Sequence, residues 1–198
     1  LIISTGMANL REISEAVDVA SVSRDGLILL HCTSGYPTPI SETNLQTIND
    51  MNKRFGLPVG LSDHTRGNSV AIAASAIGAS VIEKHITLSR TDGGPDAEFS
   101  LEPHEFTQLC QDCRDAWEAI GHVNYQLEES EVNMIPLRRS LYAVKDVELG
   151  EKLTQNNIRS IRPGYGLAPR DWHLVEGRLA ARNIKRGAPL SWDDIEDN

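Results

Sequence analysis

Two histidines and an aspartate are the residues of this chain whose types and spacing most clearly suggest chemistry. His64 and His85 each stand at or just after the C-terminal end of a predicted strand, and Asp96 follows in the loop after His85. Imidazole is a good ligand for divalent transition metals, and a nearby carboxylate can add an oxygen ligand or orient a ligating ring. For the pair, a metal site and a structural role as hydrogen-bonded polar residues at the rim of a fold are both open interpretations, whereas for a single histidine the structural role is favoured.

Short hydroxyl residues occupy similar positions at the strand ends. Ser4, Ser34 and Ser62 each stand where an apolar run gives way to a loop. Together with backbone N–H groups, hydroxyls at such positions can hold a phosphate or a carboxylate. Serines are also common caps of the helix that follows a strand, and from the residues alone helix capping is the default role for all three.

Lys84 is next to His85 in the sequence, but we do not expect it to share the site. Side chains alternate between the two faces of a strand, so Lys84 is predicted to point away from the face that carries His85. It could pair with Glu83 or with solvent instead.

The elements that must position these residues alternate between strands and helices. Short apolar runs are followed by segments whose apolar residues recur with helical spacing. Four strand–helix units predict a parallel sheet with crossover helices, either half of a (β/α)8 TIM barrel or a small open sheet. Both architectures place their sites at the C-terminal ends of the strands. The predicted strands are Leu1–Ser4, Leu27–Cys32, Val59–Ser62 and Val81–His85, and the predicted helices are Asn9–Ala20, Glu42–Phe55, Ser69–Ala79 and Pro103–Gly121.

The sequence changes character after this α/β region. Residues 123–137 are acidic and polar, as is typical of a linker. The last segment has short predicted strands at Ser140–Val144 and Ala180–Ile184, an edge at Leu190–Trp192 and several Gly/Pro turns. This pattern predicts a small β-rich module.

The distribution of charge supports two modules. Residues 1–137 contain 8 basic and 19 acidic residues, whereas residues 138–198 contain 11 basic and 9 acidic residues. The net charge of −9 makes a nucleic acid an unlikely class of partner. No apolar run reaches the roughly 18 residues of a membrane helix.

The chain opens on the apolar run Leu1–Ser4 without a Met, which suggests that an N-terminal portion precedes it.

Cys110 and Cys113 form a C-x-x-C, but they fall on a predicted helix and no second pair completes a four-ligand set. Ordinary thiols are the better interpretation, with a zinc or redox pair as the alternative.

In combination, several motifs resemble the sialic acid synthase family. The resemblance covers essentially all 198 residues, with the motifs in the family's order. Those of the first module are His31–Pro39, Gly60–Thr65, Glu83–His85 and Gly94–Asp96, and those of the second module are Arg139–Leu141 and Arg162–Gly166, which resemble the family's antifreeze-like (SAF) domain.

The resemblance implies a fold and an assembly. Residues 1–122 would form a partial TIM barrel with barrel strands five to eight, residues 123–137 the linker, and residues 138–198 the SAF domain. Strands one to four are absent from the chain. Members of this family are cytoplasmic, domain-swapped homodimers in which the small domain of one subunit covers the barrel mouth of the other.

The resemblance also implies a metal-dependent condensation of phosphoenolpyruvate with an amino sugar. His64 and His85 would hold a divalent metal (Mn²⁺, Mg²⁺ or Co²⁺), and Asp96 would complete the catalytic group by positioning a hydroxyl or a water. The metal would polarise the sugar aldehyde for attack by the weakly nucleophilic enol carbon.

The same resemblance assigns the substrate-binding residues. Ser4, Ser34 and Ser62 would bind the phosphate of phosphoenolpyruvate, and Tyr36 would contact substrate. Arg162 would reach the sugar's N-acetyl oxygen in the partner subunit. A contact that stabilises its own loop is the alternative role for Arg162.

Four stretches are most similar to the branch of the family that makes pseudaminic acid from 2,4-diacetamido-2,4,6-trideoxy-altrose. They are Cys32–Pro37, Gly93–Pro103, Arg139–Tyr142 and Ile158–Gly164. The branches that make N-acetylneuraminate or legionaminic acid are the alternatives within the family. Outside it, the alternatives are a metal-dependent hydrolase with a third protein ligand and a non-enzymatic carbohydrate-binding module or inactive fragment.

Overall fold

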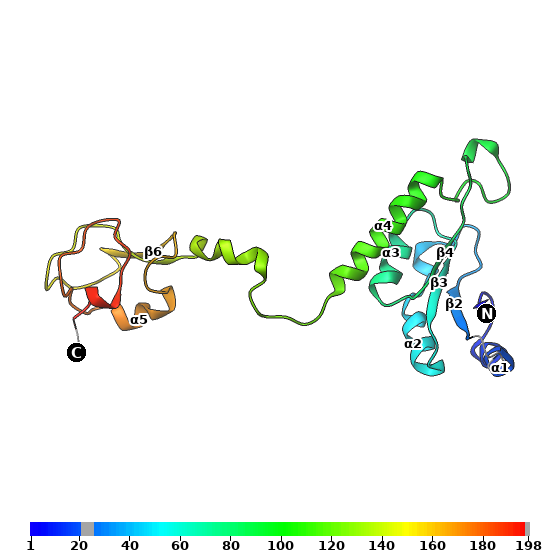
Figure 1. The fold of residues 1–198 in the computed structure, drawn as a ribbon, viewed down its shortest axis with the longest axis horizontal. Helices are drawn as coiled ribbons and strands as arrows, with labels where there is room; N and C mark the ends of the chain where they lie inside the picture. Colours follow the sequence, from blue (N-terminus) through cyan, green and yellow to red (C-terminus); the bar gives the residue numbers. More distant parts are fainter. Residues whose placement is uncertain (21–25, 197–198) are drawn as a thin grey trace. The chain divides into compact units, whose positions relative to one another are not determined.

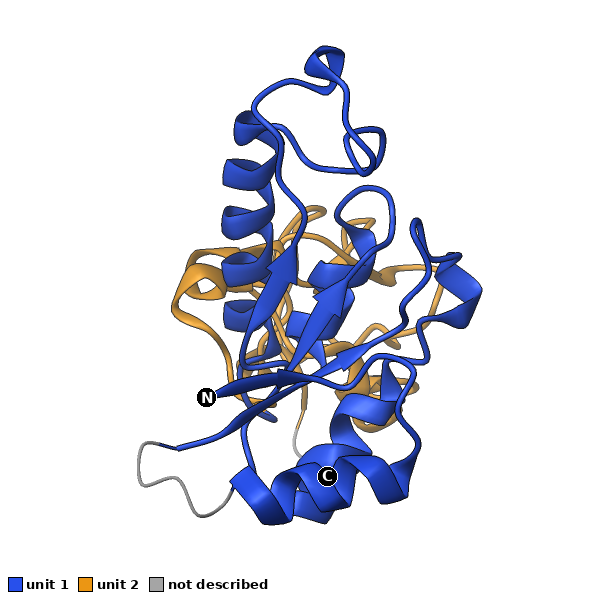
Figure 2. Ribbon diagram, turned by 90° about the vertical axis from the view of Figure 1, so that its right-hand side faces the viewer, with its two compact units in different colours: residues 1–123 blue, residues 124–198 orange. Residues whose placement is uncertain are grey.

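The chain forms two compact units in the computed structural model, which describes residues 1–20 and 26–196. Unit 1 comprises Leu1–Val123 and unit 2 comprises Asn124–Asn198 (Figure 2). Each unit has its own hydrophobic core.

Unit 1 is built on a four-stranded parallel sheet. Its strands β1 (Ile2–Ser4), β2 (Ile28–Cys32), β3 (Val59–Asp63) and β4 (Ile82–Lys84) lie side by side in the order of the sequence. Because each strand is followed by a crossover helix, every C-terminal strand end lies at the same edge of the sheet. This arrangement confirms the predicted half of a (β/α)8 barrel.

Four helices cover one face of this sheet (Figure 1). They are α1 (Leu10–Ala20), α2 (Gln46–Phe55), α3 (Ser69–Ala76) and α4 (Pro103–Ile120). Leu29, Val59 and Leu61 point from alternate positions of β2 and β3 into the core beneath the first three helices. Alternation then requires that Leu30, Ser62 and the residues in register with them face the other way.

Local sequence explains how these helices begin and end. The Asn9 side chain accepts hydrogen bonds from the backbone N–H groups of Arg11 and Glu12 and so caps α1. Pro103 opens α4 behind a capping box of Glu102 and Glu105. The predicted helix Glu42–Phe55 is shorter than expected, because a 3-10 turn η1 (Ile40–Glu42) precedes α2.

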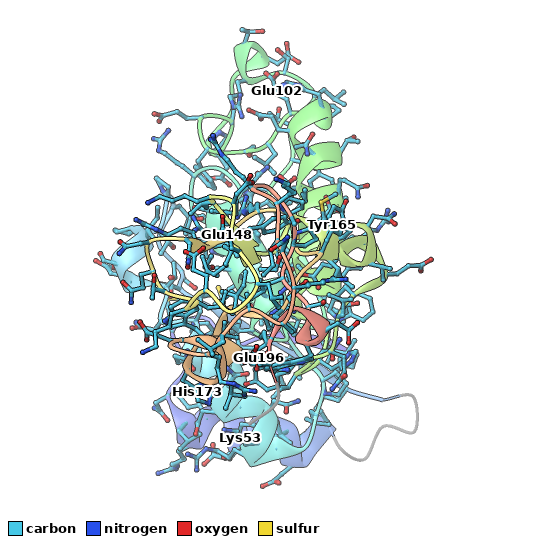
Figure 3. All side chains as sticks on the ribbon, turned by 90° about the vertical axis from the view of Figure 1, so that its left-hand side faces the viewer. Lys53, Glu102, Glu148, Tyr165, His173 and Glu196 are labelled. Atoms are coloured by element: carbon cyan, nitrogen blue, oxygen red, sulfur yellow. The ribbon has the colours of Figure 1, made fainter. Side chains whose placement is uncertain are left out.

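Unit 2 is a small antiparallel β module, as predicted. Strands β5 (Ser140–Ala143) and β6 (Ile158–Ile161) pair antiparallel, and α5 (Trp172–Val175) follows the 3-10 turn η4 (Pro169–Asp171). Leu141, Leu153, Ile158, Val175 and Leu190 are among the residues of its core. The loop before η4 carries Tyr165, which is 69% exposed (Figure 3).

Two predicted strands of unit 2 are wrong. Ala180–Ile184 makes only isolated bridges, from Ala180 to Ile195 and from Ile184 to Val147. The predicted edge at Leu190–Trp192 runs instead into a 3-10 turn η5 (Trp192–Asp194), which Ser191 caps. Short apolar runs between turns do not distinguish strands from irregular segments that are pinned by single bridges.

Two further 3-10 turns lie in the connecting segments of the chain. The turn η2 (Arg90–Asp92) lies in the loop after β4, and η3 (Glu129–Leu137) occupies most of the predicted linker.

All three cysteines are free, with Cys110 and Cys113 both on α4. Among residues 1–20 and 26–196, no helix is long and apolar enough to cross a membrane.

Candidate functional site

The sheet brings His64 and His85 together on the face opposite the helices. Ser62 is in register with Glu83 across β3 and β4, and each histidine lies two residues further along its chain. The two imidazole ring centroids are 5.1 Å apart. The expectation that the two strand ends would bring these side chains close together agrees with this geometry.

His64 is held in a defined tautomer by its backbone surroundings. The ring is buried, and its Nδ1 lies 3.1 Å from the carbonyl oxygen of Thr33. A carbonyl oxygen can only accept, so Nδ1 must carry the proton and donate it. In the neutral ring Nε2 then carries the lone pair, which is the arrangement that a metal-ligating imidazole needs. The Sγ of Cys32 lies 3.7 Å from the same Nδ1.

His85 is more open than His64 and stands beside Asp96. Its side chain is 30% exposed, and its Nδ1 lies 3.7 Å from Oδ2 of Asp96. This separation is slightly longer than a hydrogen bond, so the carboxylate is placed to orient the ring electrostatically or to turn toward a bound group. Asp96 itself is 44% exposed.

Two aromatic rings surround the histidine pair. The ring centroid of Tyr36 lies 4.3 Å from that of His64 and 5.9 Å from that of His85. The buried Phe99 approaches His85 to 5.1 Å on another side. Sequence reasoning predicted a substrate contact for Tyr36 but gave no role to Phe99, whose position depends on how the loop after β4 folds back.

The donor set fits a divalent metal ion with open coordination positions. Two imidazoles share one face of the sheet, and the Asp96 carboxylate stands beside one of them. Within the described ranges, no group of three or more His, Cys, Asp and Glu side chains is arranged to hold a metal. A metal held by His64 and His85 would therefore leave positions for other oxygen ligands.

The predicted hydroxyl residues lie along the same face. Ser62 donates a 2.6 Å hydrogen bond to Oε1 of Glu83, and Ser34 lies 3.7 Å from the Cys32 sulfur. Ser4 is exposed at the end of β1. Among the described residues, none of the three caps a helix, and Asn9 caps α1 instead. Their expected default role as helix caps is therefore wrong.

Gly6 is needed where β1 meets this face. A Cβ at Gly6 would lie 2.1 Å from Oγ of Ser34 and 3.1 Å from Sγ of Cys32. The absence of a side chain thus allows the loop after β1 to approach Ser34 closely.

Glu83 and Lys84 were placed incompletely by the sequence. The sequence suggested Glu83 only as a partner of Lys84, and its bond to Ser62 was not foreseen. Lys84 does point to the opposite face, but its partner is neither Glu83 nor solvent. Its Nζ lies 2.8 Å from Oδ2 of Asp63, and both side chains are only 1% exposed.

Arg162 belongs to unit 2 and is exposed in the loop after β6. A neighbouring cavity of about 460 Å³ is lined by Arg138, Arg139 and Arg170 together with Gly164 and Gly166.

In unit 1, a cavity of about 780 Å³ lies beside the start of α3 and shares Phe99 with the surroundings of His85.

Comparisons with known proteins agree with this architecture. Residues 1–125 match the model of the NeuB family, and residues 138–196 match that of the SAF domain. The chain is 42% identical to the N,N'-diacetyllegionaminic acid synthase of Campylobacter jejuni, covering 93% of this chain and 57% of the relative. It is 36% identical to the pseudaminic acid synthase of the same species, covering 98% of this chain and 57% of the relative.

Solved structures give the same result. The N-acetylneuraminic acid synthetase of Leptospira borgpetersenii has a TM-score of 0.61 at 36% identity, covering 68% of this chain and 47% of that one. The spore coat polysaccharide biosynthesis protein spsE of Bacillus subtilis has a TM-score of 0.57 at 28% identity, covering 100% of this chain and 61% of that one. The chain thus spans about 57% of the length of the curated relatives it matches. It belongs to the NeuB family and carries a SAF domain at its C-terminal side.

Proposed function

We propose that the full-length protein is a phosphoenolpyruvate-dependent nonulosonic acid synthase whose metal site is the pair His64 and His85. The observation that carries this proposal is the pairing of the two imidazoles at 5.1 Å on the open face of the sheet, with the Nε2 lone pair of His64 available. The reaction joins the enol carbon of phosphoenolpyruvate to the aldehyde of an amino sugar. Water adds at C2, and inorganic phosphate leaves with cleavage of its C–O bond.

Enzymes of the NeuB family are metal-dependent, and a bound metal supplies Lewis acidity that polarises the aldehyde. The residues of this chain would supply the rest of the site. Thr33 fixes the tautomer of His64 through its carbonyl, and Asp96 orients His85 and positions a hydroxyl or a water. Tyr36 packs its ring against His64 and would contact substrate.

The hydroxyl residues would bind the phosphate of phosphoenolpyruvate. Ser62 already donates to Glu83, so its hydroxyl would have to turn from the carboxylate to the phosphate when substrate binds. Ser34 and Ser4 lie on the same face at the ends of β2 and β1. Hydroxyl groups contributed by three neighbouring strands can surround an anion without placing a fixed positive charge there.

Two sugars are candidates for the second substrate. The four stretches that resemble the pseudaminic branch favour 2,4-diacetamido-2,4,6-trideoxy-altrose. The 42% identity to a legionaminic acid synthase, against 36% to a pseudaminic acid synthase, makes the legionaminic precursor the second candidate. N-acetylmannosamine, the sugar of the N-acetylneuraminate branch, serves as the third comparison.

The test is phosphate release from phosphoenolpyruvate by the full-length protein with Mn²⁺, with the three sugars assayed side by side. We expect release with the altrose derivative and little with N-acetylmannosamine. Release only with the legionaminic precursor would move the assignment to that branch and leave the site unchanged. Release with none of them, despite bound metal, would contradict the proposed reaction.

We also propose that the protein works as a domain-swapped homodimer in which Arg162 of one subunit contacts the sugar bound by the other. The acidic balance of residues 1–137 and the basic balance of residues 138–198 support docking of one on the other. Mixing an H64A variant with an R162A variant, each inactive alone, should restore activity, because the mixed dimer keeps one intact site. If the mixture stays inactive although mixed dimers form, the two residues act in the same subunit.

A further inference from the structure

We propose that the buried ion pair of Asp63 and Lys84 is a positioning device that holds His64 and His85 in their metal-binding arrangement. This inference rests on the proposed metal site. It concerns two side chains that lie on the helix-facing side of the sheet, away from the face that carries the histidines. Asp63 and Lys84 are therefore positioning residues.

The pair ties together the two chain segments that carry the histidines. Asp63 and Lys84 are the last residues in register between β3 and β4, and each immediately precedes one of the histidines. Lys84 Nζ lies 2.8 Å from Asp63 Oδ2 with both side chains 1% exposed. The ion pair thus joins the strands at the point where their backbone ladder ends.

The residue after His64 is fixed by the same pair. The second oxygen of Asp63, Oδ1, accepts a 2.8 Å hydrogen bond from the backbone N–H of Thr65. Lys84 Nζ donates a 2.6 Å hydrogen bond to the carbonyl oxygen of Thr65. His64 is therefore held on both sides, by Asp63 before it and by Thr65 after it.

The surroundings make a purely stabilising role a poor explanation. The neighbouring positions on this face, Val59 and Leu61, are apolar and packed into the core. A buried ion pair often contributes no more stability than apolar residues of similar size, because desolvation offsets the attraction. The bonds of this pair have fixed directions, however, and metal affinity depends on ligand geometry to within about 0.5 Å.

The test compares metal binding with stability in the full-length protein. The double substitution Asp63→Asn and Lys84→Met removes both charges while keeping similar side-chain volumes, and the asparagine oxygen can still accept from Thr65. The control is I48A, which opens a cavity in the same core from α2, away from both histidines. H64A and H85A are measured alongside, with Mn²⁺ as the titrant and Co²⁺ as the spectroscopic probe.

We expect the double variant to bind Mn²⁺ about 10–100-fold more weakly than wild type and to change the visible absorption of bound Co²⁺. Its melting temperature without metal should be no lower than that of I48A, and I48A should keep the wild-type Mn²⁺ affinity. An unchanged Mn²⁺ affinity and Co²⁺ spectrum in the folded double variant would overturn the proposal. So would an equal loss of affinity in I48A, because affinity would then follow stability alone.

The remaining variants separate failure of this inference from failure of the proposed function. If H64A and H85A both keep wild-type Mn²⁺ affinity, the proposed metal site is wrong. The positioning role is then wrong as well, because it depends on that site. If they lose affinity while the double variant does not, only the positioning role is wrong. Should the double variant not fold cooperatively, the single substitution Lys84→Arg is measured in the same comparison with the same outcomes, because it keeps the charge of the pair but changes the directions of its hydrogen bonds.

Discussion

The two units of this chain bury their apolar residues in different ways. In unit 1 the apolar side chains of β2 and β3 pack against helices on one face of the sheet, and the other face carries the polar pairs Ser62–Glu83 and His64–His85. In unit 2 a single core collects residues from Leu141 to Ile195 out of short strands, turns and bridges. Unit 1 is therefore layered, with helices on one face of a sheet, whereas the elements of unit 2 surround a single core.

This difference shows where each unit can place function. A layered sheet leaves one face for chemistry, and its strand order fixes which polar residues become neighbours there. A small module whose elements surround one core has few buried positions for functional side chains, so we expect such residues in exposed loops, where Arg162, the proposed sugar contact, lies. The predictions below test whether unit 1 is organised around its polar face and unit 2 around its core.

The largest effect is expected from H64A or H85A. Each should lower Mn²⁺ affinity and phosphate release together by more than about 100-fold, because each removes one of the two imidazoles proposed as ligands. Calorimetry and a phosphate-release assay would measure this. H104A is the matched control, since His104 is 76% exposed by its side chain at the start of α4. Full activity with no bound metal would show that the polar face of unit 1 does not work through a metal.

The next effect is expected in the core of unit 2. L153A should lower the free energy of unfolding of unit 2 by about 2–5 kcal/mol, because the Leu153 side chain is fully buried and the substitution leaves a cavity. Denaturant unfolding of the 124–198 segment within the full-length protein would be followed by Trp172 and Trp192 fluorescence. L174A, at a position that is 47% exposed, should cost far less. Equal costs would mean that unit 2 is not organised around this core.

A smaller effect is expected from S62A on the polar face of unit 1. Losing one hydrogen bond to a charged phosphate is worth about 1.5–3 kcal/mol, so kcat/KM for phosphoenolpyruvate should fall roughly 10–100-fold. Mn²⁺ affinity should stay the same. S80A, at the opposite end of the sheet, serves as the control. A loss of metal affinity in S62A would place Ser62 with the metal rather than with the phosphate.

The smallest effect is expected from D194N in unit 2. Burial alone would raise the pKa of Asp194, but hydrogen bonds from the Ser191 backbone and hydroxyl and from Arg182 outweigh it and lower the pKa below its usual value. Its carboxylate thus stabilises unit 2 above the unfolded pKa of about 3.9, and this stability is lost as pH falls through the lower folded pKa. D194N should cost about 1–2 kcal/mol at pH 7 and little at the lowest pH.

Thermal unfolding from neutral to acid pH would measure this last effect. If the cost of D194N were the same at every pH, the ionised carboxylate would not be its source. D193N supplies the neighbouring control, because Arg182 and Ser191 donate the hydrogen bonds of this network to the carboxylate of Asp194.

Much of unit 1 could be predicted from its sequence. Apolar runs and helical spacing gave its four strands and four helices, because each of those patterns is local and repeats along the chain. The positions of His64 and His85 at strand ends followed from the same patterns. Unit 2 was predicted less well, since Ala180–Ile184 resembles a strand locally but is held by single bridges to distant residues.

The sequence by itself determined the alternation of strands and helices, the location of the histidines at the strand ends, and the family motifs. Only the tertiary structure decided which side chains meet. The alternation of side chains along the strand predicted that Lys84 points away from His85. The register of β3 and β4 determines that its partner is Asp63. The contact of Phe99 with His85 likewise depends on how the loop after β4 returns to the sheet. These contacts join residues far apart in the chain, and local propensity carries no information about such pairings.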